Sequence, residues 1–427
     1  MVHFTREFRI ETRCNSHNQS HEFGHEGLEL NEITYATELQ CVGCGSKYRL
    51  EETVLTCSKC GEVLDVNYDL SRLKKRKSYR ESLKERSHSL WRYREFLPIL
   101  SDDQIVSLGE GLTPLAKVPR YARAVELHGL VMKLDYLNPT GSFKDRGTTT
   151  SVSKLKELGV HTAMDDSSGN AGSSLAAYCA AAGIECTLYV PATAPREKLT
   201  QAQMYGARIN KITGSRTDVA KAAEAAWKTT RIFYASHNLS PFFFEGMKTV
   251  AYEICEDLVW QAPDHVIFPV GGGTLMAGAW KGFRELKELG WISRTPKLHC
   301  TQSDACMPIV NAFQSGSAKV TPVEEKETIA GGVRISNPGR GQEVLGAVRE
   351  SGGQAIAVAD DAILKHQQMI ARSEGIFPEP TSCVPLAGLE KLREAGVLKA
   401  DDVIVVPLTG FGLKDVTTAM ASLSRNK

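Results

Sequence analysis

The residues with the clearest chemical potential lie in the segment Asn138–Gly147, which reads Asn-Pro-Thr-Gly-Ser-Phe-Lys-Asp-Arg-Gly. Asn-Pro-Thr-Gly favours a turn after an apolar stretch, and a helix is expected to begin around Ser142. Lys144 would then lie in the first helical turn, where free amides and the helix dipole disfavour its ammonium form. A neutral lysine amine can form an imine with a carbonyl compound. A lysine near a helix start is by itself more often a surface residue, so the other motifs must decide.

Two glycine-rich segments have the composition of anion-binding turns. The segment Ser167–Ser174 contains two glycines and is expected to open a helix at Ser173. The run Gly271–Gly273 follows an expected strand and precedes a helical stretch at Met276. Glycines let the backbone approach an anion closely, while successive amides and a helix terminus supply donors. The alternative for the first segment is a simple helix cap.

Four cysteines form two Cys-x-x-Cys pairs, Cys41 with Cys44 and Cys57 with Cys60. This spacing places four thiolates at tetrahedral corners, the geometry of a closed structural zinc site. A glycine follows each pair and lets the backbone turn so that amides point at the sulfurs. Two redox pairs or unligated thiols are the alternatives. A four-thiolate site has no open position and would be a scaffold.

Composition excludes several classes of protein. The 427 residues are 42% hydrophobic and 24% charged, as in ordinary globular proteins, and exceed the ~150 of one typical domain. A net charge of +1 gives no reason to expect nucleic acid or an acidic membrane as partner. No apolar run reaches the ~18–20 residues of a membrane span, and the first residues lack a signal peptide's apolar core. The 11 cysteines fit a reducing cytoplasm best.

The elements that must position these motifs alternate between strands and helices from about residue 100. Short apolar runs predict buried strands, and the stretches between them predict amphipathic helices, so we expect an α/β architecture with mainly parallel sheets. The expected strands are Gly129–Leu134, Cys186–Val190, His265–Val270 and Val403–Leu408. The expected helices include Ser153–Leu158, Ser173–Ala182, Ala220–Trp227 and Met276–Leu289.

The lysine segment matches, at every position, the cofactor-lysine motif of the threonine synthase branch of fold type II pyridoxal-phosphate enzymes. The resemblance continues in order from Trp91-Arg-Tyr-Arg to Thr409-Gly-Phe-Gly-Leu-Lys-Asp and so covers most of the chain. It implies pyridoxal 5'-phosphate held as a Schiff base on Lys144. It also implies a tryptophan synthase β-like fold, two open twisted sheets flanked by helices, with an N-terminal zinc-ribbon-like module.

The resemblance also implies a division into domains. Residues 1–37 would be an N-terminal extension, 38–68 the zinc-ribbon-like module and 69–98 a helical linker anchored by aromatic residues. Residues 99–152 and 250–427 would form the large cofactor-binding domain. Residues 153–249 would form a small inserted α/β domain.

Each motif then resembles a part of the family's site. Besides Lys144, the cofactor contacts implied are Asn170 on the phenolic oxygen, Gly271, Gly272, Gly273 and Thr274 around the phosphate, and Thr409 at the pyridine nitrogen. A hydroxyl at that nitrogen tempers how far the ring acts as an electron sink. The substrate contacts implied are Glu110, Thr113, Ser142, Ser167, Ser168, Gly169 and Lys248.

Two positions depart from the family pattern. Phe411 stands where histidine is common, and Phe243 stands where the family has an arginine that suits a substrate phosphate. The Glu-Pro-Ala-Ser-Ala segment is also altered, to Glu379–Cys383. A phosphate needs a cationic partner in a closed site, because charge-assisted contacts are the strong ones. Lys248, Lys414 or Arg146 could take that role.

The function expected is that of a PLP-dependent lyase that converts O-phosphohomoserine and water to threonine and phosphate. The alternatives are a related enzyme, such as cysteate synthase acting on phosphoserine and sulfite or a threonine/serine dehydratase-like lyase, and a non-catalytic binding homologue. The partner expected is a small amino-acid substrate, with no nucleic acid and no membrane. A homodimer in the cytoplasm is expected from the family.

Overall fold

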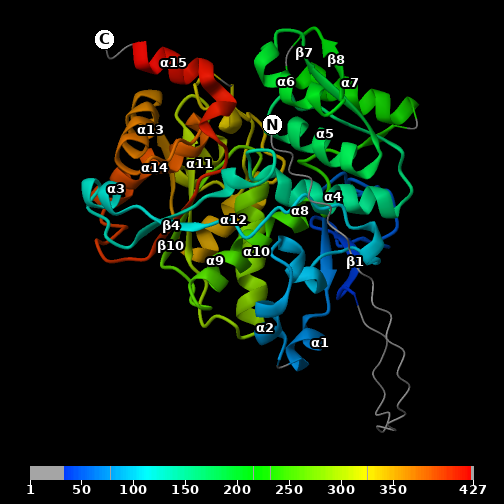
Figure 1. The fold of residues 1–427 in the computed structure, drawn as a ribbon, viewed down its shortest axis with the longest axis horizontal. Coiled ribbons are helices and arrows are strands. Elements are labelled where there is room, and N and C mark those ends of the chain that lie inside the picture. The colour runs from blue at the N-terminus through cyan, green and yellow to red at the C-terminus, as the bar shows by residue number, and fades with distance from the viewer. Residues whose placement is uncertain (1–32, 77, 215, 231, 325, 425–427) are drawn as a thin grey trace, which may run out of the picture. The chain divides into compact units, whose positions relative to one another are not determined.

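The computed structural model describes residues 33–427, except for residues 77, 215, 231, 325 and 425–427. Residues 33–427 form one compact unit (Figure 1). Most of the predicted extension, residues 1–32, lies outside the described residues. Within the described part, no helix is long and apolar enough to cross a membrane.

The cysteine pairs lie on a small antiparallel sheet. Its strand order is β2-β1-β3, with β1 at Ala36–Cys41, β2 at Lys47–Tyr48 and β3 at Leu64–Tyr68. Gly45 and Gly61, which follow the two pairs, have φ angles of 72° and 80°. Glycine adopts this left-handed backbone without steric cost, so the predicted turns are confirmed.

Residues 69–98 form short helices that pack on the rest of the unit. These are α1 (Leu70–Lys75), α2 (Tyr79–Ser82) and the 3-10 helices η1 (Leu83–Glu85) and η2 (Leu90–Phe96). Trp91 and Tyr93 of η2 are buried, and the Tyr93 hydroxyl donates to Glu256. The predicted aromatic anchor is therefore confirmed.

The larger sheet has the strand order β12-β11-β10-β13-β5-β4. Its pairs are parallel except for β4–β5. Val266 and Phe268 of β10 belong to one hydrophobic core and Ile267 to another, as expected when a parallel sheet is covered on both faces. The strands are β4 (Leu115–Lys117), β5 (Leu130–Lys133), β10 (His265–Pro269), β11 (Lys297–Ser303), β12 (Ala355–Val358) and β13 (Ile404–Pro407).

The smaller sheet is parallel throughout and has the order β8-β7-β6-β9. Leu188 and Tyr189, adjacent on β7, pack in different cores, so this sheet is also covered on both faces. In Figure 1 the helices α6 and α7 accompany β7 and β8. The strands are β6 (Thr162–Asp165), β7 (Glu185–Pro191), β8 (Arg208–Ile212) and β9 (Phe233–Tyr234).

The predicted strands and helices are confirmed, with different helix starts. The helices expected from Ser142, Ser173 and Met276 begin at Lys144, Asn170 and Thr274. The longer helices are α3 (Pro119–Ala124), α4 (Lys144–Glu157), α5 (Asn170–Ala182), α6 (Arg196–Met204), α7 (Arg216–Thr229), α8 (Pro241–Met247), α9 (Thr249–Asp257), α10 (Thr274–Glu288), α11 (Pro308–Gln314), α12 (Gly341–Ser351), α13 (Asp360–Glu374), α14 (Pro380–Glu394) and α15 (Val416–Ser424).

The two sheets agree with the predicted architecture. The proposed boundary between residues 152 and 153 falls inside α4, which runs without a break from Lys144 to Glu157. The division of the chain into domains stays a prediction.

Candidate active site

Lys144 is the first residue of α4, in the first helical turn, as predicted. The turn before it is fixed against the segment that follows β13. Phe143 donates its backbone N–H to the Thr409 carbonyl at 2.9 Å, and Ser142 pairs with Gly410 in an isolated bridge. The fold thereby brings Lys144 and Thr409, which are 265 residues apart in the sequence, into one site.

Asp145 ties this turn to the start of α5. Its carboxylate accepts hydrogen bonds from the Thr140 N–H at 2.7 Å, the Thr140 hydroxyl at 2.6 Å and the Ser174 hydroxyl at 2.6 Å. Burial raises the pKa of Asp145 to about 6, although these hydrogen bonds oppose the shift. Asp145 therefore fixes the turn that precedes Lys144 and joins it to α5.

Arg146 is fully buried between two carboxylates. Its guanidinium donates to both oxygens of Asp135, at 2.9 and 2.7 Å, and to both oxygens of Glu253, at 2.5 and 2.7 Å. Burial favours a raised pKa for Glu253, but the charges of Arg146 and Lys133 outweigh it and hold that pKa at about 2. Arg146 thus acts as a structural clamp, because all its charge is compensated within the protein.

Asn170 begins α5 and points its amide at a carboxylate from a distant helix. Its Nδ2 lies 3.1 Å from each oxygen of Glu379. The preceding loop is tight, since Gly169 donates its N–H to the Ser167 hydroxyl at 3.3 Å. A Cβ at position 172 would lie 2.2 Å from the Ser167 carbonyl, so only glycine fits there. Ser167, Ser168 and Gly169 therefore lie at a helix N-terminus, where an anion is favoured.

The glycine run lies at the carboxyl end of β10 and caps α10. Gly273 has a φ of 94°, and no side chain caps this helix start, so its first amides are open to a ligand. A Cβ at position 271 would lie 2.4 Å from the Gly332 carbonyl, and one at position 272 would lie 2.5 Å from Asn238 Oδ1. The loop with Thr274 at its end thus has the form of a phosphate cradle.

Thr409 follows β13 and is buried. Its hydroxyl lies 3.0 Å from the Ser382 hydroxyl, which also accepts the Gly410 N–H at 2.8 Å. Ser142, by contrast, is fully buried, and its hydroxyl has no hydrogen-bond partner among the described residues. Such an orphaned group calls for a ligand, so the residues present fit a bound cofactor or substrate.

Two predicted substrate contacts are held by the protein itself. The Glu110 carboxylate accepts from Trp91 Nε1 at 3.0 Å and from the Tyr178 hydroxyl at 2.6 Å. The Thr113 hydroxyl donates to Asp135 at 2.7 Å, within the Arg146 cluster. Their roles as substrate ligands stay predictions. In the structure, these hydrogen bonds fix the loop at residues 108–115, which contains both side chains.

Lys248 is also committed to internal contacts. Its ammonium group is fully buried, pairs with Glu245 at 2.7 Å and Glu285 at 3.0 Å, and lies 3.7 Å from the centre of the Tyr68 ring. Two carboxylates satisfy one ammonium, so this geometry gives no support to a substrate phosphate at Lys248. That role stays a prediction.

The three phenylalanines of α8 enter three different environments. Phe242 belongs to the core of the cysteine-bearing sheet, and the Phe244 ring lies 3.8 Å from the Arg340 guanidinium. The Phe243 ring centre lies 5.6 Å from Lys144 Nζ. On its other side lies His237, with ring centres 6.1 Å apart. Position 243 therefore borders the lysine but brings no charge.

Sequence reasoning missed two supports of the site. Glu379 and Ser382, at the start of α14, contact Asn170 and Thr409, yet they were noted only as part of an altered segment. His237 pairs with Asp165 at 2.9 Å, and Asp165 ends the strand that leads into the serine-glycine loop. The available sequence signal was that Glu379 and Ser382 belong to the altered segment Glu379–Cys383 and that Asp165 lies two residues before Ser167.

The four cysteine sulfurs lie together. Cys41 Sγ is 3.4 Å from Cys60 Sγ, Cys44 Sγ is 3.5 Å from Cys57 Sγ, and all four lie within 4.8 Å of one another. A zinc ion with Zn–S bonds of about 2.3 Å separates its sulfurs by roughly 3.8 Å. The Tyr48 hydroxyl donates to Cys57 and lowers the pKa of that thiol to about 5. The cluster is compatible with zinc.

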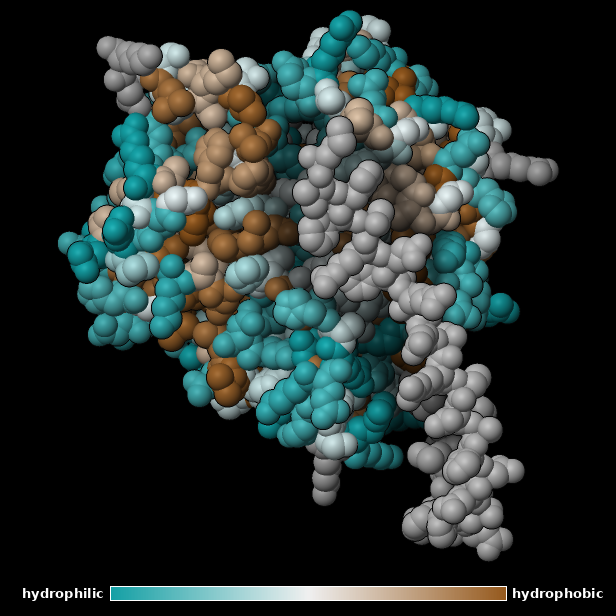
Figure 2. Space-filling view, viewed as in Figure 1, coloured by the Kyte–Doolittle hydropathy of each residue, from teal (hydrophilic) through white to brown (hydrophobic). Residues whose placement is uncertain are grey.

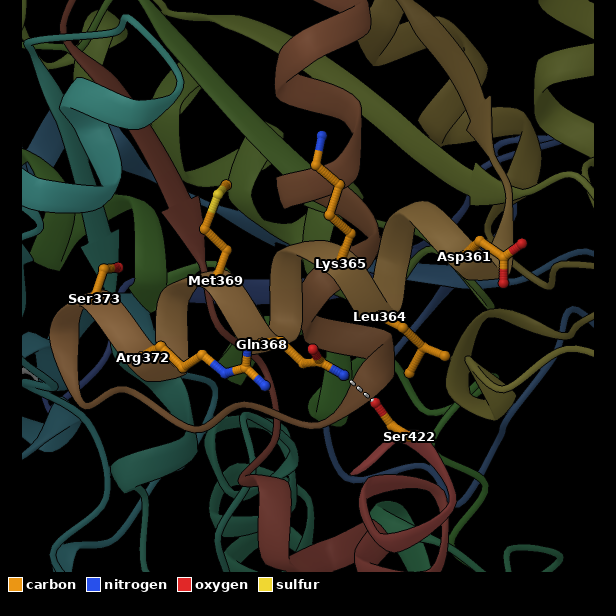
Figure 3. A pocket seen from close by; sticks show the side chains of 8 residues that line it. All are labelled: Asp361, Leu364, Lys365, Gln368, Met369, Arg372, Ser373 and Ser422. Atoms are coloured by element: carbon orange, nitrogen blue, oxygen red, sulfur yellow. Dashed lines mark hydrogen bonds between the residues drawn. The ribbon is translucent and has the colours of Figure 1, made fainter. Parts of the chain in front are cut away.

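A groove of about 690 Å³ runs along the outer side of α13 and reaches Ser422 of α15. Figure 3 shows its lining side chains, with Gln368 hydrogen-bonded to Ser422. None of the predicted site residues lines this groove. The size of this groove therefore does not mark the active site, which is identified by the residues around Lys144.

Fold and site define a class of enzyme, and comparisons with known proteins agree. The family model described as pyridoxal-phosphate dependent enzyme matches residues 106–410. The solved structure of maize serine racemase superposes with a TM-score of 0.65 at 21% identity, covering 74% of this chain and 92% of that one. A tomato (Solanum lycopersicum) threonine deaminase gives 0.63 at 19%, covering 74% and 88%. These similarities show a fold type II architecture.

Sequence relatives narrow the class. The chain is 41% identical over 382 residues to the threonine synthase of Methanocaldococcus jannaschii, covering 89% of this chain and 94% of that one. It is 40% identical over 383 residues to that of Methanosarcina acetivorans, covering 90% and 93%. The chain therefore belongs to the pyridoxal-phosphate-dependent lyases of the threonine synthase branch.

Proposed function

We propose that this protein is a threonine synthase, which converts O-phosphohomoserine and water to threonine and phosphate. The observation that carries the proposal is the intact lysine turn, held by Asp145 and Thr409, in a chain that is 41% identical to a threonine synthase. When bound, pyridoxal phosphate would supply an electron sink for carbon–hydrogen and carbon–oxygen bond cleavage.

The chain's own residues have separable tasks in this proposal. Lys144 Nζ would hold the cofactor, and its amine is the group placed to move protons at the substrate carbon atoms. The amides of the glycine run and Thr274 hold the cofactor phosphate. Asn170 and Thr409 orient the ring, and the loop Ser167–Gly169 receives the substrate carboxylate.

Phe243 favours a second candidate. Phe243 carries no charge, and Arg146 and Lys248 are ion-paired within the protein. Lys414, the third cation considered, donates to the Gln201 amide oxygen and remains the candidate for a substrate phosphate. A β-eliminating enzyme that acts on serine or threonine would need no such cation, whereas the related β-replacement enzyme acting on phosphoserine with sulfite would still need one.

A substrate panel separates the two candidates. Purified protein loaded with pyridoxal phosphate would be given phosphohomoserine, phosphoserine with and without sulfite, serine and threonine, with phosphate, keto acid and threonine measured. We expect threonine and phosphate in equal amounts from phosphohomoserine alone. Keto acid from serine or threonine, without threonine formation from phosphohomoserine, would replace the first candidate by the second.

The cysteine cluster is proposed to hold one structural zinc ion. The sulfur spacing and the backbone N–H groups of Cys44 and Lys59, each 3.4 Å from a cysteine sulfur, support it. Metal analysis should find one zinc per chain and its loss in Cys41→Ser. Unchanged zinc in that variant, with Cys383→Ser as control, would refute this site.

We also propose that the protein is a homodimer located in the cytoplasm. No disulfide joins two cysteines within the described part of the chain, which suits a reducing compartment. Leu413 and three residues of α15, Val416, Met420 and Leu423, are exposed apolar side chains, and Figure 2 shows apolar surface in that region. Sedimentation analysis should give twice the chain mass.

A further inference from the structure

The start of α14 supports both polar residues predicted to contact the cofactor ring. Ser382 holds the Thr409 hydroxyl at 3.0 Å, and Glu379 accepts from Asn170 through both carboxylate oxygens. The two supports are three residues apart, on one helix turn, while Asn170 and Thr409 come from opposite parts of the chain.

The Glu379 carboxylate is confined to this place. Its backbone N–H donates to the Gly410 carbonyl at 2.9 Å, and Pro378 pairs with Phe411 in an antiparallel bridge. A Cβ at position 410 would lie 2.3 Å from the carboxyl carbon of Glu379. Glycine at 410 is therefore the condition for the carboxylate to reach Asn170.

The chemistry of the pair fixes the orientation of the amide. An ionised carboxylate only accepts hydrogen bonds, so the nitrogen of Asn170, and not its oxygen, must face Glu379. The two equal distances of 3.1 Å fit one N–H shared between both oxygens of Glu379, so the second hydrogen of the amide nitrogen is left to donate elsewhere. Without Glu379 the amide could flip and present its oxygen, an acceptor, to the site.

We propose that Glu379 is a positioning residue that orients the Asn170 amide so that its nitrogen donates to the phenolic oxygen of pyridoxal phosphate. This inference rests on the proposed function, because it assumes that the cofactor binds at Lys144. Burial raises the pKa of Glu379, while the Asn170 hydrogen bonds and the charge of Lys414 oppose that shift and favour the accepting form.

The test measures cofactor affinity in a double-mutant cycle of Asn170→Ala and Glu379→Ala, with bound cofactor followed by absorbance after equilibrium dialysis. We expect Glu379→Ala to weaken pyridoxal phosphate binding about tenfold, the effect of one hydrogen bond to a charged group. In the Asn170→Ala background the same substitution should have almost no effect, because the partner is already gone. Glu379→Gln, which can still accept from Asn170, should bind within about threefold of wild type.

Controls make each outcome decisive. Glu374→Ala removes another carboxylate that accepts a single backbone N–H, from Tyr121 at 2.7 Å, and should leave affinity unchanged. Additive effects of the two substitutions, wild-type affinity in Glu379→Ala, or a loss in Glu379→Gln as large as in Glu379→Ala would each overturn the inference. If Glu379→Ala does not fold, as judged by circular dichroism, Glu379→Gln and Gly410→Ala, which displaces the carboxylate, give the same comparison. Absence of cofactor binding in the wild type would instead refute the proposed function.

Discussion

The turn that carries Lys144 and the helix α8 meet at the lysine side chain, where the rings of Phe143 and Phe243 lie 4.8 and 5.6 Å from its nitrogen. The turn is held by charges and hydrogen bonds, chiefly through Asp145 and Arg146. Toward the lysine, helix α8 presents the Phe243 ring, which lies so close that a Cβ at Gly147 would be 2.7 Å from it. The one carboxylate of this helix, Glu245, pairs with Lys248 and Lys281. One side of the site is specified by polar geometry and the other by packing.

This difference explains why the two sides were not equally predictable. Each polar residue of the turn needs a hydrogen-bond or charge partner of a defined type. Few other residue types could replace it, so the sequence motif predicts its contacts. The phenylalanines of α8 contact elements that are distant in sequence. Phe242 packs in the core of the cysteine-bearing sheet, and Phe244 packs against Arg340. The close contact with Gly147 explains how a large apolar ring packs at position 243.

The largest expected effect concerns the polar side. Arg146→Ala leaves the buried Asp135 carboxylate without a cation and Glu253 with Lys133 alone, which should cost about 3–5 kcal/mol of unfolding free energy. Urea unfolding measures this loss. Arg294→Ala, which removes a half-exposed pair with Asp264, should cost at most about 1 kcal/mol. Equal losses in the two variants would show that buried charge does not hold the turn.

The next effect is a pH dependence at Asp145. Its pKa in the folded state, about 6, lies above the 3.8 of an unperturbed aspartate. Its contribution to stability is therefore fully present below about pH 4 and lost as the pH rises through about 6. Two pKa units correspond to about 3 kcal/mol. The wild-type minus Asp145→Asn difference in unfolding free energy should fall by about that amount between pH 4 and pH 7.

Urea unfolding of both proteins across this pH range tests the expectation. Glu253, with its lowered pKa, acts in the opposite direction, but it is present in both proteins and cancels in the difference. A difference that stays constant or grows with pH would contradict the role given to Asp145.

The smallest effect concerns the apolar side. Phe243→Leu keeps most of the buried apolar volume, so it should cost about 1 kcal/mol of stability. The dissociation constant of pyridoxal phosphate should change by less than about threefold, because no polar cofactor contact comes from α8. Loss of the cofactor in this variant would remove the distinction between the two sides.

The strands and helices were predictable because their apolar periodicity is local. The sequence predicts the start of α5 at Ser173, because Gly169 and Gly172 favour a turn, but the helix begins at Asn170. Gly172 lies inside the helix, where close approach to the Ser167 carbonyl excludes a side chain.

The site was predictable only where a motif is continuous in sequence. The Lys248–Glu285 ion pair and the support of Asn170 by Glu379 join residues 37 and 209 positions apart, and no local pattern predicts them. Lys248 resembled a substrate contact for that reason, while Glu379 received no role.

The central claim is that Lys144 carries the cofactor. Borohydride reduction of the protein loaded with pyridoxal phosphate, followed by digestion and peptide mass spectrometry, tests it most directly, because reduction makes the lysine linkage permanent. We expect the added mass on the peptide that contains Lys144, and neither that mass nor the long-wavelength absorbance of lysine-bound cofactor in Lys144→Ala. A label on another lysine, or absorbance that persists in Lys144→Ala, would contradict the account.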